Sequence, residues 1–145
     1  MKIAIYPGSY DPITNGHLDI IERSSSLFDK IIVAVARNAE KVSALFSESE
    51  RITMINRSIS HLKNVEVDSF NGLLVNYAAE KNSNAIIRGL RALSDFEFEF
   101  KMALMNRSLK EEISTVFMMP HEKFTHISSS LVKEVASLGG DVSAY

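Results

Sequence analysis

Residues 30–36 read Lys-Ile-Ile-Val-Ala-Val-Ala, a β-branched and almost unbroken apolar run. Such a run is typical of a strand that is buried on both faces, as the strands of parallel sheets are. Shorter apolar segments of the same character lie on either side of it along the chain. They predict further strands at residues 2–6, 65–67, 85–87 and 115–119.

Longer segments with helical periodicity separate these strands. Ser47 and Glu50 have the spacing of a capping box, and Ile52, Ile55 and Ile59 then recur at intervals of three and four. The same periodicity predicts helices at residues 16–28 and 73–81. A last helix is expected from the serines at 128–130 to residue 137, where Gly139 and Gly140 follow.

The segment after residue 93 gives a conflicting signal. Phe96, Phe98 and Phe100 alternate as they would in a strand, whereas Ser94 and Glu97 have the spacing of a second capping box. The length of the segment favours a helix, which we expect to begin at this box and to run to about residue 109.

Strands and helices thus alternate along a chain of 145 residues, which is the length of a single domain. This alternation is typical of the α/β class. We predict one doubly wound, Rossmann-like domain over residues 1–145, with a five-stranded parallel sheet in strand order 3-2-1-4-5 and helices on both faces. Such sheets bind ligands beyond the carboxyl ends of their strands, where the strand order reverses.

The composition excludes several kinds of function. Sixteen Lys and Arg face eighteen Asp and Glu, so a net charge of −2 removes the simplest reason to expect a nucleic-acid partner. The absence of cysteine excludes disulfides, thiolate metal sites and a cysteine nucleophile. The opening residues are broken early by Pro7 and Gly8, so we expect no signal peptide, and no run of eighteen apolar residues is present. We therefore expect a cytoplasmic protein with no membrane partner.

Residues 7–18 connect the first strand to the first helix. Gly8 permits a tight turn and a close approach of the backbone to a ligand. Gly16 and His17 begin the helix, where unpaired N–H groups and the helix dipole favour an anion. An ordinary strand-to-helix loop with one exposed histidine explains the same residues. The spacing is neither that of a Walker loop nor that of a GxGxxG fingerprint.

Arg88 and Arg91 follow the fourth strand, with Gly89 between them. Arginine recognises planar phosphate oxygens, and glycine lets a ligand reach the backbone. A surface turn with two solvated arginines is the alternative. In the predicted strand order, this loop and the loop after the first strand flank the switch point and open on one crevice.

Other polar groups give weaker signals. The serines at 128–130 either hold a phosphate or only cap the last helix. Lys41 lies in a polar loop after the second strand, where it can reach the same crevice. Asp95 and Glu99 are one helical turn apart, so they indicate either acid–base or metal chemistry, or a complement to the helix dipole.

Residues 6–17, YPGSYDPITNGH, resemble the signature of the nucleotidyltransferase superfamily, whose T/HxGH motif is Thr14-Asn15-Gly16-His17 here. Nearly the whole chain further resembles the bacterial phosphopantetheine adenylyltransferase family. The stretches that carry this resemblance are IRGLR at 87–91, DFEFE at 95–99, MNR at 105–107 and ISSSLVKEV at 127–135.

The resemblance implies reversible adenylyl transfer from ATP to 4′-phosphopantetheine, which gives dephospho-coenzyme A and pyrophosphate late in coenzyme A biosynthesis. It also implies Mg²⁺ that arrives with the ATP, and a homohexamer. The apolar residues of 96–105 fall on more than one face of their helix. One face can therefore pack on a neighbouring subunit, or the helix can be buried inside one subunit.

The resemblance also implies roles for individual residues. His17, Lys41 and Ser9 would be catalytic, with His17 stabilising the charge on the α-phosphate. The phosphopantetheine site would comprise Ser9, Lys41, Leu74 and Arg88. The ATP site would comprise Ser9, Tyr10, His17, Gly89, Leu90, Arg91, Glu99, Phe124, Thr125, His126, Ile127, Ser128, Ser129 and Ser130.

Three features depart from the family pattern. Ser9 stands where threonine is usual, but the hydroxyl is kept. The loop of Lys41 lacks a second lysine. The chain ends at Tyr145, earlier than is usual in the family. We expect the additional C-terminal helix of typical family members to be absent or truncated here. The remaining alternatives are a related transferase that acts on nicotinate mononucleotide or glycerol phosphate, and a non-catalytic nucleotide-binding module.

Overall fold

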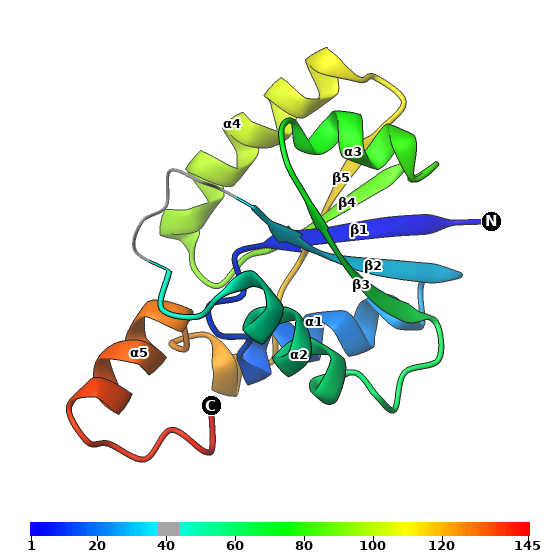
Figure 1. The fold of residues 1–145 in the computed structure, drawn as a ribbon. Helices are drawn as coiled ribbons and strands as arrows, with labels where there is room; N and C mark the ends of the chain where they lie inside the picture. Colours follow the sequence, from blue (N-terminus) through cyan, green and yellow to red (C-terminus); the bar gives the residue numbers. More distant parts are fainter. Residues whose placement is uncertain (38–43) are drawn as a thin grey trace.

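Five parallel strands form one sheet in the order β3-β2-β1-β4-β5 (Figure 1). The computed structural model describes residues 1–37 and 44–145, and residues 93 and 94 by their backbone alone. The strands are β1 (Ile3–Gly8), β2 (Lys30–Ala36), β3 (Val65–Phe70), β4 (Ala85–Gly89) and β5 (Ser114–Met118). The predicted class, strand order and parallel pairing are confirmed.

Helices cover both faces of the sheet, with α1 and α2 on one side and α3 and α4 on the other (Figure 1). The helices are α1 (Asn15–Ser25), α2 (Glu48–Ser58), α3 (Leu74–Glu80), α4 (Leu93–Leu109) and α5 (Ser129–Ser137), with a short 3-10 helix η1 (Glu122–Phe124) before α5. None of the helices in the described parts of the chain has the length and apolarity that crossing a bilayer requires.

Strand β2 explains why the sheet is buried on both sides. Val33 packs with Ile21 of α1 and Ile55 of α2 in one apolar cluster. Its neighbour Ile32 packs with Val75 of α3 in the cluster on the opposite face. Successive side chains of a strand point to opposite faces, so an unbroken apolar run is what two helical layers require.

Strands β1 and β4 extend further toward their carboxyl ends than predicted. Gly8 pairs with Val35, and Gly89 pairs with Met118, so both glycines belong to the sheet. A Cβ atom at Gly89 would lie 2.7 Å from Cδ1 of Ile20. A larger residue at this position would displace the end of the Ile20 side chain, so the glycine allows α1 to pack closely where the strand ends beside the site.

The caps of the helices are partly as predicted. The Ser47 hydroxyl accepts from the N–H of Glu50, and the Glu50 carboxylate accepts from the N–H of Ser47, so the first capping box is confirmed. Ser128 caps α5 through the N–H of Leu131, as expected. Helix α5 is followed by Gly139, whose φ is +86°.

The predicted capping box at Ser94 and Glu97 is wrong. Helix α4 begins at Leu93, and its N-cap is Ala92, which makes no side-chain hydrogen bond. Glu97 is exposed and forms an ion pair with Lys101 at 3.6 Å. The helix therefore begins before the serine.

Helix α4 leaves most of its apolar side chains exposed. Phe96 stacks on Phe100, with ring centroids 5.6 Å apart, and tilts against Phe117 of β5. The exposed apolar side chains, which we call the α4 patch, are Phe96, Phe98, Phe100, Met102, Leu104, Met105 and Leu109. The alternative that this helix is buried inside one subunit is therefore wrong.

Candidate active site

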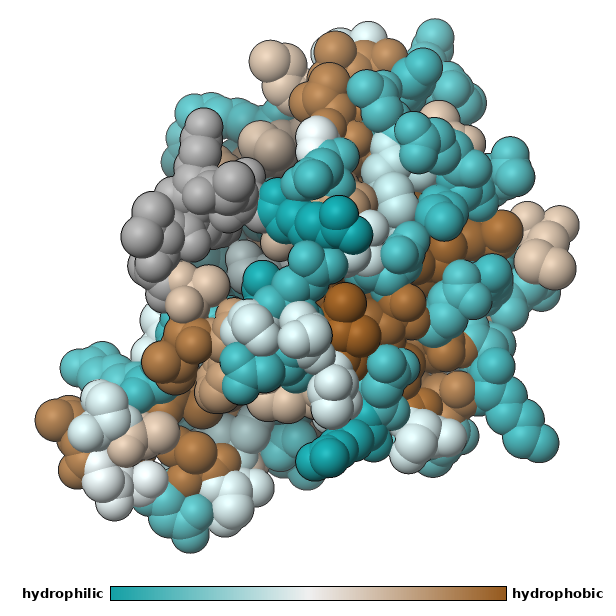
Figure 2. All heavy atoms as spheres, viewed as in Figure 1, coloured by the Kyte–Doolittle hydropathy of each residue, from teal (hydrophilic) through white to brown (hydrophobic). Residues whose placement is uncertain are grey.

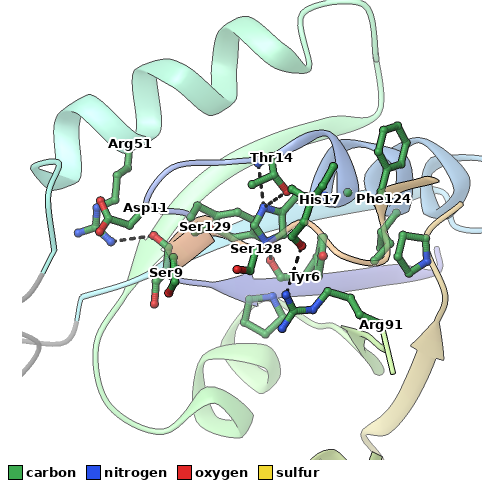
Figure 3. Close-up of a pocket in the computed structure, with 18 of the residues that line it drawn as sticks. Tyr6, Ser9, Asp11, Thr14, His17, Arg51, Arg91, Phe124, Ser128 and Ser129 are labelled. Atoms are coloured by element: carbon green, nitrogen blue, oxygen red, sulfur yellow. Dashed lines mark hydrogen bonds between the residues drawn. The ribbon is translucent and has the colours of Figure 1, made fainter. Parts of the chain in front are cut away.

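A cavity of about 550 Å³ lies at the carboxyl ends of β1 and β4, between the starts of α1 and α5 (Figure 3). This is the switch point of the sheet, where the predicted crevice was expected, and its volume is sufficient for a nucleotide. The predicted site residues that line it are Ser9, Tyr10, His17, Arg88, Gly89, Arg91, Phe124, Ile127, Ser128, Ser129 and Ser130.

His17 is fixed at this cavity by the cap of α1. The main-chain N–H of Thr14 donates to Nδ1 of His17 at 3.0 Å, and the Thr14 hydroxyl accepts the main-chain N–H of His17 at 3.4 Å. Because Nδ1 accepts a hydrogen bond, the proton of the neutral ring lies on Nε2. The imidazole thus presents an N–H donor on the side away from the cap.

The surroundings of His17 keep its ring neutral. Burial, together with the positive charge of Arg91, lowers the pKa of His17 to about 4. The rings of Tyr6 and Tyr10 lie edge-on to the imidazole, with centroids 6.4 and 5.0 Å away. Burial raises the pKa of both phenols, so they are protonated at neutral pH. At neutral pH the His17 ring is therefore uncharged and carries one N–H donor, on Nε2.

Arg88 is held by a bidentate ion pair. Its Nε and Nη2 donate to the two oxygens of Glu99 at 2.8 and 2.9 Å. These hydrogen bonds raise the pKa of Arg88. The pair fixes the plane of the guanidinium at the cavity wall, while Glu99 itself does not line the cavity.

Asp11 links three segments around the cavity. Its buried carboxylate accepts the main-chain N–H groups of Leu45 and Phe46, each at 2.9 Å, and the Nζ of Lys133 at 2.9 Å. Burial acts to raise its pKa, but the hydrogen bonds from Lys133, Phe46 and Leu45 prevail and lower it. The β1–α1 loop, the segment just before α2 and helix α5 are therefore held together by one charged group.

Two arginines brace the walls by donating to carbonyl groups. Nη1 of Arg51 donates to the carbonyl of Ser9 at 2.8 Å, which joins α2 to the loop after β1. Nη1 of Arg91 donates to the carbonyl of Ile127 at 3.2 Å, which joins the end of β4 to the segment before α5. Both guanidinium groups thus remain beside the cavity and contribute positive charge to it (Figure 3).

Some predicted site residues are not brought to the cavity wall. Leu74 packs at the edge of the cluster under α3. The main-chain N–H of Leu90 donates a hydrogen bond to the carbonyl of Met118. Thr125 bonds to Glu122, and the ring of His126 lies against that of Tyr145. Lys41 lies outside the residues that the structure describes.

The sequence analysis did not assign Asp11, Arg51 and Lys133 to this cavity, and it quoted Thr14 within the T/HxGH motif without giving it a role. A signal was present for Thr14, since a threonine three residues before His17 has N-cap spacing. Lys133 lies one helical turn after Ser129, so it shares a face of α5 with a predicted site residue. No local pattern reveals Asp11 and Arg51, because their partners are far away in the sequence.

The described residues contain no group of three His, Cys, Asp or Glu side chains placed to hold a metal ion. Asp11, which lines the cavity, is paired with Lys133, and Glu99 is paired with Arg88 at the cavity wall. A metal ion here would therefore depend on ligand oxygens, as Mg²⁺ commonly does.

The sheet order, the cavity at its switch point and the Thr14–His17 motif define a protein of the nucleotidyltransferase class. The model of the cytidylyltransferase-like family matches residues 5–135. The phosphopantetheine adenylyltransferase of Desulfosudis oleivorans is 58% identical over 143 residues, which cover 99% of this chain and 84% of that protein. The phosphopantetheine adenylyltransferase of Alkaliphilus metalliredigens is 54% identical and covers 100% of this chain and 92% of its own length. The chain belongs to the cytidylyltransferase-like family, among its phosphopantetheine adenylyltransferases.

A solved structure shows the same fold at low sequence identity. The nicotinic acid mononucleotide adenylyltransferase of Plasmodium falciparum superimposes with a TM-score of 0.68 at 18% identity, over 97% of this chain and 86% of that one. At this identity the likeness concerns the fold alone.

Proposed function

We propose that this protein transfers an adenylyl group from ATP to 4′-phosphopantetheine, forming dephospho-coenzyme A and pyrophosphate. The observation that carries the proposal is a nucleotide-sized cavity in which a neutral imidazole donor lies among Arg51, Arg88 and Arg91. The family membership supports the choice of substrate.

The reaction needs no general base. The phosphate of 4′-phosphopantetheine is already ionised, and one of its oxygens attacks the α-phosphorus of ATP. The bond from that phosphorus to the oxygen bridging to the β-phosphate breaks, and pyrophosphate leaves. The barrier is the approach of one anion to another, so catalysis consists of in-line positioning and stabilisation of negative charge.

The proposed role of His17 rests on its position in the cavity, and the roles of the other residues, Lys41 included, are those that the family resemblance implies. Nε2–H of His17 would donate to an oxygen of the α-phosphate, in the place where charge increases in the transition state. Ser9 would contact the reacting phosphate, and Arg88 would hold the phosphate of 4′-phosphopantetheine. Arg91 and the serines of α5 would hold the β- and γ-phosphates. Lys41 would help bridge the two substrates.

Magnesium is part of the proposal as a component of the substrate. Because Asp11 and Glu99 are occupied by cations, we expect Mg²⁺ to arrive bound to the phosphates of ATP. A reaction that consumes ATP belongs in the compartment that holds ATP, so the proposal includes a cytoplasmic location.

We also propose that the protein assembles as a homohexamer through the α4 patch. The exposed Phe, Met and Leu side chains of the α4 patch lie on more than one face of the helix, and so many exposed apolar side chains on one element are typical of a surface that another protein covers. The number of subunits is the one that the family resemblance implies. Figure 2 shows hydrophobic side chains gathered at the top of the view, over the carboxyl end of α4.

The test is release of pyrophosphate from ATP and Mg²⁺ with one acceptor per reaction. The acceptors are 4′-phosphopantetheine, nicotinate mononucleotide and glycerol phosphate, and a reaction without acceptor is the control. Of the three acceptors, we expect only 4′-phosphopantetheine to cause release of pyrophosphate. Release only with another acceptor would keep the class and overturn the substrate. No release with any acceptor would favour a non-catalytic nucleotide-binding module.

A further inference from the structure

The segment that follows β5 is tied to the side of α1 by one carboxylate. Oδ2 of Asp19 accepts the main-chain N–H of His121 at 2.9 Å, although 102 positions separate the two residues. The same oxygen accepts Nε of Arg23 at 3.0 Å, and the Asp19 side chain is 20% exposed. Asp19 therefore connects the helix that begins at the cavity to the chain between β5 and α5.

His121 in turn fixes the start of η1. Its Nδ1 accepts the main-chain N–H of Lys123 at 3.2 Å, and its carbonyl accepts the main-chain N–H of Phe124 at 2.9 Å. The rings of His121 and Phe124 also lie edge to face, with centroids 6.3 Å apart. Helix η1 thus begins at the residue that Asp19 holds, and the place of Phe124 depends on that residue.

The residues on both sides of His121 form an apolar part of the cavity wall. Pro120 and Phe124 line the cavity together with Ile20 of α1, and we call these three residues the apolar wall (Figure 3). A Cβ atom at Gly16 would lie 3.6 Å from Cβ of Phe124, so the wall packs directly on the start of α1. The arginines of the cavity come from α2, from β4 and from the residues just after β4. Apolar and aromatic side chains fit the base of a nucleotide, whereas guanidinium groups fit its phosphates.

The chain after α5 is tied to the same side of α1. The main-chain N–H of Asn15 donates to the carbonyl of Tyr145 at 2.6 Å, and Nδ2 of Asn15 donates to the carbonyl of Ala144 at 3.0 Å. Asn15 and Asp19 are four residues apart, so they share a face of the helix. This face of α1 therefore holds the chain both before and after α5.

We propose that Asp19 is a positioning residue for the base of ATP, because it holds His121 and so sets where the apolar wall lies relative to α1. Without this hydrogen bond the wall keeps its side chains but loses its fixed place, and binding of the base then includes the cost of ordering the wall. The phosphates bind elsewhere in the cavity and are not affected. The proposal rests on the proposed function, which supplies ATP as the ligand.

The test is calorimetry with Mg²⁺, and it compares ATP with tripolyphosphate, which has the phosphate chain of ATP but no base. We expect Asp19→Ala to weaken binding of ATP roughly tenfold and to leave binding of tripolyphosphate unchanged. Asp19→Asn keeps an oxygen that can accept the N–H of His121, so it should restore most of the affinity for ATP. Arg23→Gln is the matched control, because it removes the other partner of Asp19 and leaves the hydrogen bond to His121 in place.

The outcomes separate this proposal from the proposed function. Unchanged affinity for ATP in Asp19→Ala would overturn the role of Asp19, and so would an equal loss for tripolyphosphate, which would show a general disturbance of the site. A loss that Asp19→Asn does not restore, or that Arg23→Gln reproduces, would also overturn it. If all variants bind as expected but wild type releases no pyrophosphate from ATP with 4′-phosphopantetheine, the proposed acceptor is wrong and the role of Asp19 stands.

Discussion

The main-chain N–H of Thr14 donates to Nδ1 of His17, and the Thr14 hydroxyl accepts the main-chain N–H of His17 in return. The same reciprocal pair closes the first turn of α1 and selects the ring tautomer with its proton on Nε2. The stability of the helix and the orientation of a donor in the cavity therefore depend on one local structure.

Replacement of Thr14 by valine tests this coupling. Valine keeps the shape but removes the hydroxyl, so we expect a loss of about 1 kcal/mol in the free energy of unfolding, and a lower kcat because His17 is held less firmly. Denaturant unfolding and steady-state kinetics are the measurements. Thr14→Ser should retain both properties, and equal kcat values for the valine and serine variants would contradict the coupling.

His17→Ala separates transition-state stabilisation from substrate binding. The Nε2–H donor matters most where negative charge increases, so we expect kcat to fall by a factor on the order of 100 or more while the affinity for ATP changes little. Turnover is measured by pyrophosphate release and affinity by calorimetry. A fall in ATP affinity as large as the fall in turnover would assign His17 to ground-state binding.

The depressed pKa of His17 makes stability depend on pH. The native ring resists protonation until about pH 4, whereas in the unfolded chain it gains a proton near pH 6.5. The unfolded state therefore binds more protons between these values, and stability falls as the pH falls through this window, by at most about 3 kcal/mol in total. Above pH 6.5 the contribution is fully present.

Unfolding of wild type and His17→Gln between pH 4 and pH 7 measures this contribution. Titration of Asp11 is common to both proteins and cancels in the difference. The free energy of unfolding of wild type should fall more steeply toward acid than that of the variant. Parallel pH dependences would show that burial does not depress the pKa of His17.

Much of this fold could be predicted from local sequence, but the connections within the site could not. The parallel sheet could be predicted from Lys30–Ala36, because a strand that is buried on both faces has an almost unbroken run of apolar residues. The box at Ser94 and Glu97 misled because its spacing recurs by chance in a helix that begins at Leu93. The hydrogen bonds of Asp11 join residues 34 to 122 positions apart, and no local pattern encodes such distances.

Glu99 acts through Arg88 in this structure, whereas the family resemblance assigns it to the nucleotide site. Glu99→Gln removes the charge of the bidentate pair and loosens the guanidinium. We expect KM for 4′-phosphopantetheine to rise roughly tenfold while KM for ATP stays near its wild-type value.

Glu97→Gln is the control for Glu99→Gln, because Glu97 lies on the exposed side of the same helix. Steady-state kinetics with each substrate varied in turn is the measurement. A rise confined to KM for ATP would return Glu99 to the nucleotide site and reject its action through Arg88.

Phe98→Glu tests the α4 patch as a subunit interface. Phe98 is 64% exposed, so a glutamate there costs the isolated subunit little, whereas at an interface it would bury a charge. We expect wild type to sediment as a hexamer, and Phe98→Glu as a smaller species with an unchanged circular dichroism spectrum. Leu27→Glu is the matched control, since Leu27 is 62% exposed and lies just beyond α1. A monomeric wild type, or a hexamer that persists in Phe98→Glu, would leave the α4 patch without the role proposed for it.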